Sequence, residues 1–178
     1  TEANYVARLE TELLVFEQQL IQLVNLTKDR NTLLILTTTP LNLDIAPKRV
    51  CEFTSTIDIE KKLATLTELM NENNPKAAYL ISSKLIKQYA GNAQLFFIHG
   101  QISKRLGLID EAKNSLLQAS AFDCNPWRAN AVYNSIIRKV AKNNQVILFD
   151  FAKLLENEWG KNITFFDEEV FEVGEAYS

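Results

Sequence analysis

The chain has 178 residues, 47% of them hydrophobic and 10% aromatic, which is enough to bury one substantial core, or one core with a helical appendage. The chain has 19 Lys and Arg residues and 22 Asp and Glu residues, which gives a formal net charge of −3. Because this charge provides no positive potential to attract phosphates, we expect no nucleic-acid partner. The longest apolar runs fall far short of the roughly 20 residues that cross a bilayer, so we expect no membrane span.

The chain begins at Thr1, without an initiator Met and without the basic and then apolar order of a signal peptide. We therefore expect a processed product or a shortened chain, and the compartment stays open. Cys51 and Cys124 lack metal-binding or redox spacing, so buried free thiols are favoured over a disulfide.

The first predicted element is an amphipathic helix over residues 4–28. Its apolar positions recur at spacings of three and four, which indicates one broad packing face. The next element, "TLLILTTTP", is a continuous apolar run, as in a strand that is covered on both faces in a parallel sheet. The apolar helix positions are Val6, Leu9, Leu13, Phe16, Leu20 and Leu23.

Residues 57–122 contain no strand-like run and predict four short helices, at about 58–72, 75–90, 93–106 and 108–122. Pro75 marks a helix start, and Gly91 and Gly107 mark helix ends. The last two helices follow the tetratricopeptide (TPR) pattern, although a His and a Ser replace its Leu and its aromatic residue. The matching positions are Phe96, His99, Gly100, Ser103, Gly107, Ala112, Leu116 and Ala119.

A second helix and strand follow, in "PWRANAVYNSIIRKVAKNN" and "QVILFDF". Two helix-then-strand units predict an α/β fold, a partial three-layer, flavodoxin-like parallel sheet with an all-helical TPR-like insertion. The predicted organisation is an α/β segment over 1–50, the insert over 51–124, a second α/β segment over 125–167 and an acidic tail over 168–178.

The stretches "TTTPLNLDIAP", "NPWRANAVYNSIIRKVAKNNQVILFDFAKLL" and a late "FFD" flank the insert in this order. Over most of residues 1–167 the chain thus resembles the C-terminal half of SGNH (GDSL-type) hydrolases with a TPR-like insert. The resemblance implies an ester hydrolase acting on a glycan O-acetyl group or a small acyl ester.

The same resemblance implies a Gly-Asp-Ser nucleophile and a late Asp-x-x-His base. None of the five Gly residues is followed by Asp-Ser, and the late position reads Asp-Glu-Glu-Val from Asp167. The only histidine, His99, falls at a packing position of the repeat. We therefore assign no catalytic residue, and whether the chain is an enzyme stays open.

Four residues are candidates for substrate binding: Thr38, Thr39, Asn42 and Arg128. The first three follow the carboxyl end of the predicted strand, which is where ligands bind in α/β sheets. A loop that only connects the strand to the insert would account for these three residues equally well. Arg128 has the forked donors that bind anions or sugars, but a structural cap or a cation–π contact is the favoured role. The acidic end lacks His, Cys and calcium-loop spacing, so we expect no metal and no cofactor.

Two functions remain open. The first is an SGNH-type esterase module, either a fragment that lacks its N-terminal half or a non-catalytic relative. The second is a TPR-like scaffold that binds a peptide or protein on its helical insert without chemistry. Because two strands alone leave open edges, we also expect a missing half or a homo-oligomer to complete the sheet.

Overall fold

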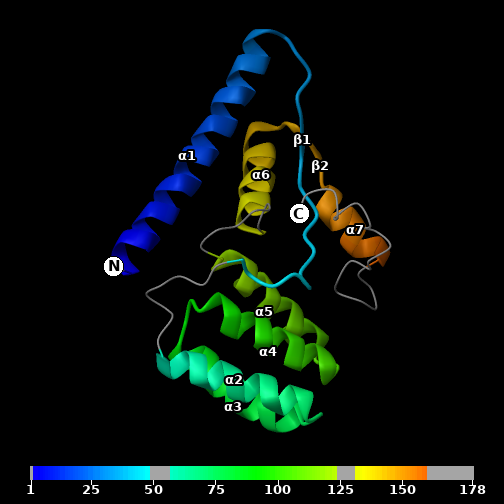
Figure 1. Cartoon of the computed structure of the whole chain (residues 1–178). Coiled ribbons are helices and arrows are strands. Elements are labelled where there is room, and N and C mark those ends of the chain that lie inside the picture. Colours follow the sequence, from blue (N-terminus) through cyan, green and yellow to red (C-terminus); the bar gives the residue numbers. More distant parts are fainter. Residues whose placement is uncertain (1, 49–56, 124–130, 160–178) are drawn as a thin grey trace. The chain divides into compact units, whose positions relative to one another are not determined.

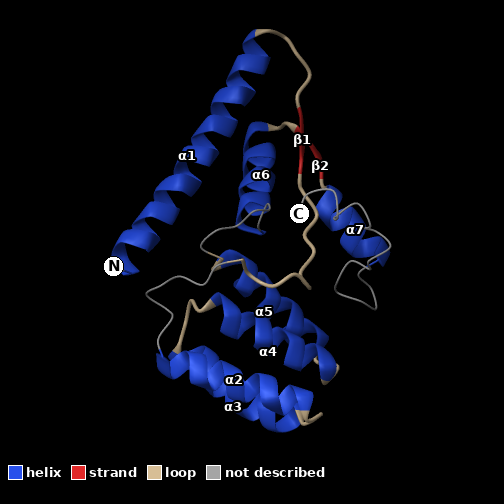
Figure 2. Cartoon of the chain, viewed as in Figure 1, coloured by secondary structure: helices blue, strands red, loops and turns tan. Residues whose placement is uncertain are grey.

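A computed structural model describes residues 2–48, 57–123 and 131–159 of the chain. Within these ranges the elements are seven helices and two three-residue strands, so the described chain is predominantly helical (Figure 2). The contacts divide it into two compact units. Unit 1 contains the described parts of Thr1–Leu41 and Ala129–Glu158, and unit 2 those of Asn42–Arg128 and Trp159–Ser178.

Unit 1 consists of three helices and a parallel pair of strands. Helix α6 lies between α1 and the strand pair (Figure 1). The small core of this unit joins Val24 of α1 and Leu36 of β1 to Ile136 and Val140 of α6. Its elements in chain order are α1 (Glu2–Asp29), β1 (Ile35–Thr37), α6 (Ala131–Asn144), β2 (Ile147–Phe149) and α7 (Phe151–Trp159).

The predicted three-layer α/β fold is wrong. Within the described residues the sheet has two strands, paired in register with Ile35 beside Ile147. The face that carries Leu36 packs against α1 and α6. Leu36 is 7% exposed, but Ile35 and Ile147 are 54% and 53% exposed on the opposite face. A continuous apolar run therefore did not indicate a strand buried on both faces, because every second residue of β1 faces solvent.

Unit 2 contains two antiparallel helical hairpins. The first joins α2 (Ile57–Asn71) to α3 (Pro75–Gln88), and the second joins α4 (Ala93–Arg105) to α5 (Ile109–Ala121). Helix α4 packs against all three of the others, so the hairpins share one core (Figure 1). The buried residues of that core are Ile59, Leu66, Ala78, Leu85, Leu95 and Ile102.

The four helix spans predicted between residues 57 and 122 are confirmed to within two residues at each end. Pro75 is the first residue of α3, where its missing N–H costs no helical hydrogen bond. The side chain of Asn92 caps α4 by accepting a hydrogen bond from the N–H of Leu95, 2.9 Å away. Gly107 follows α4 with a φ of +75°, a conformation that favours glycine.

The predicted division at residues 50, 124 and 167 stays a prediction. The predicted acidic tail, Cys51 and Cys124 lie outside the described residues. Within the described ranges, no helix is both long enough and apolar enough to cross a membrane.

Candidate functional site

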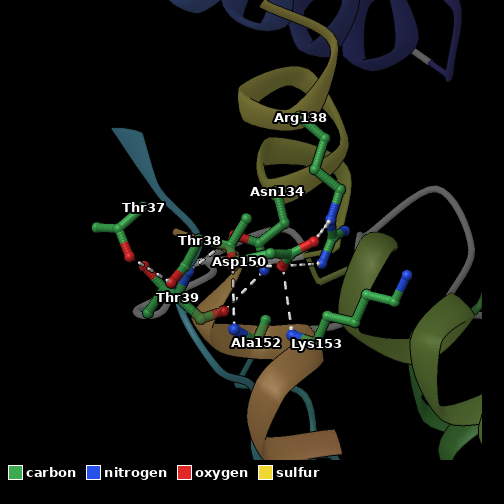
Figure 3. Close-up of polar contacts among 8 residues, drawn as sticks. All are labelled: Thr37, Thr38, Thr39, Asn134, Arg138, Asp150, Ala152 and Lys153. Carbon is green, nitrogen blue, oxygen red and sulfur yellow. Dashed lines mark hydrogen bonds and ion pairs between the residues drawn. The ribbon is translucent and has the colours of Figure 1, made fainter. Parts of the chain in front are cut away.

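Polar side chains gather where β1 and β2 of unit 1 end, the edge at which parallel strands present their carboxyl ends (Figure 3). At their centre lies Asp150, which follows β2 directly and precedes α7. Its Oδ1 accepts hydrogen bonds from Thr38 Oγ1 at 2.8 Å and from the N–H of Lys153 at 3.3 Å. Asp150 thereby caps α7 and ties it to the end of β1.

Arg138 of α6 completes the environment of this carboxylate. Its Nε donates to Oδ2 of Asp150 and its Nη2 to Oδ1, both at 2.8 Å, in the forked geometry that gives the strongest ion pairs. These hydrogen bonds lower the pKa of Asp150 to about 2. The carboxylate is therefore ionised at neutral pH and is a poor general base there.

The two predicted site residues of β1's loop are engaged within unit 1 itself. The hydroxyl of Thr38 accepts a hydrogen bond from the N–H of Ala152 at 3.0 Å, in addition to donating to Asp150. The side-chain amide of Asn134 makes two hydrogen bonds to the backbone of Thr39. Its Oδ1 accepts from the N–H of Thr39 at 3.0 Å, and its Nδ2 donates to the carbonyl oxygen of Thr39 at 2.7 Å. These contacts join α6, both strand ends and α7 into one joint (Figure 3).

The other two predicted site residues are Asn42 and Arg128. Asn42 is assigned to unit 2, where its Oδ1 accepts a hydrogen bond from the N–H of Asp44 at 2.9 Å. Arg128 lies outside the described residues. The role of the four residues in substrate binding stays a prediction.

A second polar cluster lies inside unit 2, around His99 of α4. Its Nδ1 is 2.8 Å from Ser82 Oγ on α3, and its Nε2 is 3.0 Å from Glu111 Oε1 on α5. Tyr79 stacks on the imidazole with ring centroids 5.5 Å apart and donates its hydroxyl to the same carboxylate, at 2.9 Å from Oε2. One buried histidine thus links three helices.

The order serine, histidine, carboxylate invites comparison with a nucleophilic triad, but the geometry argues against that chemistry. In the serine hydrolases Nε2 faces the serine and Nδ1 the acid, whereas here the two nitrogens are exchanged. Ser82 and His99 are both 0% exposed, so no acyl carbon reaches the hydroxyl in this arrangement. Burial also lowers the pKa of His99, although Glu111 opposes that shift, so the neutral imidazole is the favoured form.

No protein-family model, curated protein or solved structure matches the chain. The resemblance to the SGNH (GDSL-type) hydrolases is wrong, because no family match supports it and the described chain is helical, with a two-stranded sheet. The TPR pattern is only loosely consistent with the two helical hairpins, and no repeat family matches them either.

Among the described side chains, no group of three or more His, Cys, Asp or Glu residues is placed to hold a metal ion. Asp150, Arg138 and Asn134 were not predicted from the sequence as site residues. Asp150 carried a usable signal, because it directly follows the second strand-like run, at the edge where parallel strand ends meet. Arg138 and Asn134 lie within a helical pattern and carried none.

Proposed function

We propose that the chain is a protein-interaction module and that the pair of helical hairpins in unit 2 is its binding element. The observation that carries this proposal is the bracing of those hairpins by the His99 cluster. A single imidazole holds α3 and α5 on either side of α4, so the outer faces of the helices keep a fixed relation to one another. A preformed surface loses less conformational entropy when a partner binds.

The polar chemistry of the described chain supports binding better than catalysis. The Asp150 joint satisfies its own hydrogen bonds, and the His99 cluster is closed to substrate. In contrast, the helices of unit 2 expose large apolar side chains, with Ile57 75% and Leu80 65% exposed. Exposed apolar groups rimmed by charges are typical of surfaces that bind another protein.

The experiment that tests this proposal is selection of a peptide library displayed on phage against the full chain. Enriched peptides are then titrated calorimetrically into the chain and into two variants. Gly100→Ala disturbs the packing of α4 on α5 in unit 2, and Thr38→Val disturbs the joint of unit 1.

We expect a family of related peptides whose affinity falls at least tenfold in Gly100→Ala and stays within twofold in Thr38→Val. Enrichment of peptides that lose affinity only in Thr38→Val would place the binding element in unit 1. No enrichment over an unrelated helical protein would also contradict the proposal.

A further inference from the structure

Helix α3 carries a basic stripe on its exposed face. Its sequence, PKAAYLISSKLIKQ, contains three lysines and no acidic residue. Lys76, Leu80, Lys84 and Lys87 are all exposed, and at 3.6 residues per turn they fall within about 80° of the helix circumference. We call these four residues the α3 stripe.

The lysines of the α3 stripe are not neutralised by the rest of the described chain. None of them forms an ion pair or hydrogen bond with a described residue, whereas Lys62, Lys104 and Lys139 each pair with a carboxylate. The three ammonium groups therefore give α3 a local positive charge, on a chain whose formal net charge is −3.

An apolar side chain interrupts this row of charges. Leu80 lies one helical turn after Lys76 and one before Lys84, and it is 65% exposed. Ile81, next to it, is 37% exposed. A surface built only to attract anions gains nothing from these residues, whereas a partner that buries them gains the hydrophobic free energy of their area.

The opposite face of α3 is fixed, so the stripe cannot turn inward. Ala78, Ser82 and Leu85 on that face are buried, and Ser82 is bonded to His99. The cap formed by Asn74, whose Oδ1 accepts from the N–H of Ala77 at 3.3 Å, holds the start of the helix. The stripe is therefore a preformed feature of the surface of unit 2.

We propose that the α3 stripe binds an acidic, amphipathic helical segment of a partner protein. In that segment, carboxylates spaced by two and three helical turns would face Lys76, Lys84 and Lys87, and an apolar side chain between them would cover Leu80. From Lys76 to Lys84 the helix rises about 12 Å, which a second helix matches turn for turn. This inference rests on the proposed function, because it names the surface and the partner class of the same module.

The test uses the full chain and a synthetic 15-residue peptide with Glu at two positions and Leu at one position of each helical turn. The control peptide has the same composition in scrambled order, so that its acidic and apolar residues no longer share a face. Binding is measured by calorimetry at low and high salt, and the site is mapped from backbone amide shifts in NMR spectra.

We expect the amphipathic peptide to bind at least fivefold more tightly than the scrambled one and to shift amide signals of Pro75–Gln88. Changing the three lysines of the stripe to Gln should weaken binding about tenfold or more, since three ion pairs are lost. Leu80→Ala should weaken it about threefold or more at unchanged salt dependence. Lys61→Gln, at an exposed lysine of α2, is the matched control and should leave the affinity unchanged.

Several results would overturn this assignment. Equal binding of both peptides shows unspecific attraction of anions, and tighter binding of a single-stranded oligonucleotide than of the peptide assigns the stripe to nucleic acid. Self-association that Leu80→Ala abolishes assigns it to a second copy. A last variant changes the acidic residues near the C-terminal end of the chain to amides. If this variant binds the peptide more tightly, the α3 stripe binds that acidic segment of its own chain. The residues changed are Asp167, Glu168, Glu169, Glu172 and Glu175.

The proposed function and this inference fail in distinguishable ways. If phage-selected peptides bind unit 2 with unchanged affinity in the lysine variant, the chain is an interaction module and the stripe is not its binding surface. If no peptide binds unit 2 at all, both proposals fail together.

Discussion

The guanidinium of Arg138 donates two hydrogen bonds of 2.8 Å to the carboxylate of Asp150, across the end of the strand pair in unit 1. The two residues are 12 positions apart and lie on either side of β2. This pair ties α6 to the start of α7, and its electrostatics lead to the first prediction.

The stability of unit 1 should depend on the ionisation of Asp150. Its pKa falls from the ordinary value of 3.8 to about 2 in the folded chain, chiefly through the Arg138 hydrogen bonds. The stabilisation is therefore fully present above about pH 4 and is lost as the pH falls through about 2. We expect Asp150→Asn to remove this part of the pH dependence, measured by urea unfolding followed through unit 1 amide signals. Asp110→Asn, an exposed site on α5, should leave it unchanged.

The hydroxyl of Thr38 should stabilise unit 1, and that of its neighbour Thr37 should not. Thr38 is buried, and its Oγ1 bonds both Asp150 and the N–H of Ala152. Thr38→Val removes both hydrogen bonds, leaves the N–H of Ala152 without this acceptor and should cost about 1–3 kcal/mol. Thr37 is exposed and bonds only the carbonyl of Thr38, so Thr37→Val should stay within about 0.5 kcal/mol. Equal free energies of unfolding for both variants would show that the hydrogen bonds of Thr38 do not stabilise unit 1.

His99 should make unit 2 less stable as the pH falls below about 6.5. The groups facing its ring are Tyr79, Ser82 and Glu111, and burial lowers its pKa, so the unfolded chain takes up the proton first. His99→Leu should flatten the change in free energy of unfolding between pH 7 and 5.

The same substitution should cost less than about 1.5 kcal/mol at pH 7, because a leucine of similar volume fills the site. Ser82 keeps its hydrogen bond to the carbonyl of Tyr79, and Glu111 keeps that from the Tyr79 hydroxyl. Guanidinium unfolding across the pH range provides the measurement, and an unaltered pH slope in the variant would show that His99 does not titrate as described.

Gly100 should tolerate no side chain, because α4 crosses α5 closely at this point. A Cβ atom there would lie 2.5 Å from Leu116 Cγ and 3.3 Å from the carbonyl oxygen of Ala112. Replacing a helical Gly with Ala usually stabilises the helix by up to about 1 kcal/mol. At Gly100, however, overpacking should make Gly100→Ala destabilise unit 2 by about 1–3 kcal/mol.

A double-mutant cycle identifies the neighbour responsible. Leu116→Ala alone should cost about 2–5 kcal/mol, since Leu116 is buried. If the two side chains compete for one space, the double variant should be more stable than the sum of the single effects by at least about 0.5 kcal/mol. If the changes in free energy of unfolding of the two single variants are strictly additive, in thermal or urea unfolding, Gly100 and Leu116 do not compete for space and the proposed close crossing is wrong.

The helices of unit 2 were predictable because local signals agreed with one another. Amphipathic spacing, Pro75 at a helix start and Gly107 at a left-handed turn all act within a few residues of the chain. The sheet was not predictable in the same way. The apolar run around Ile35 fits a strand buried on one face or on both, and only the tertiary structure decides between them.

The polar clusters were the least predictable part. Thr38 and Asp150 lie 112 residues apart in the sequence, and no periodicity connects them. His99 was expected at a packing position, which the structure confirms, but its partners Ser82 and Glu111 lie on two other helices. Contacts of this kind depend on how the helices cross, which a single sequence does not encode as a pattern.

The central claim is that this chain binds a protein partner through the helical hairpins of unit 2. The most direct measurement is an amide-resolved NMR titration of the full chain with a phage-selected peptide. The account predicts shifts confined to residues 57–121, and loss of those shifts in Gly100→Ala. Shifts confined to residues 10–41 and 131–157, which belong to unit 1, would contradict it.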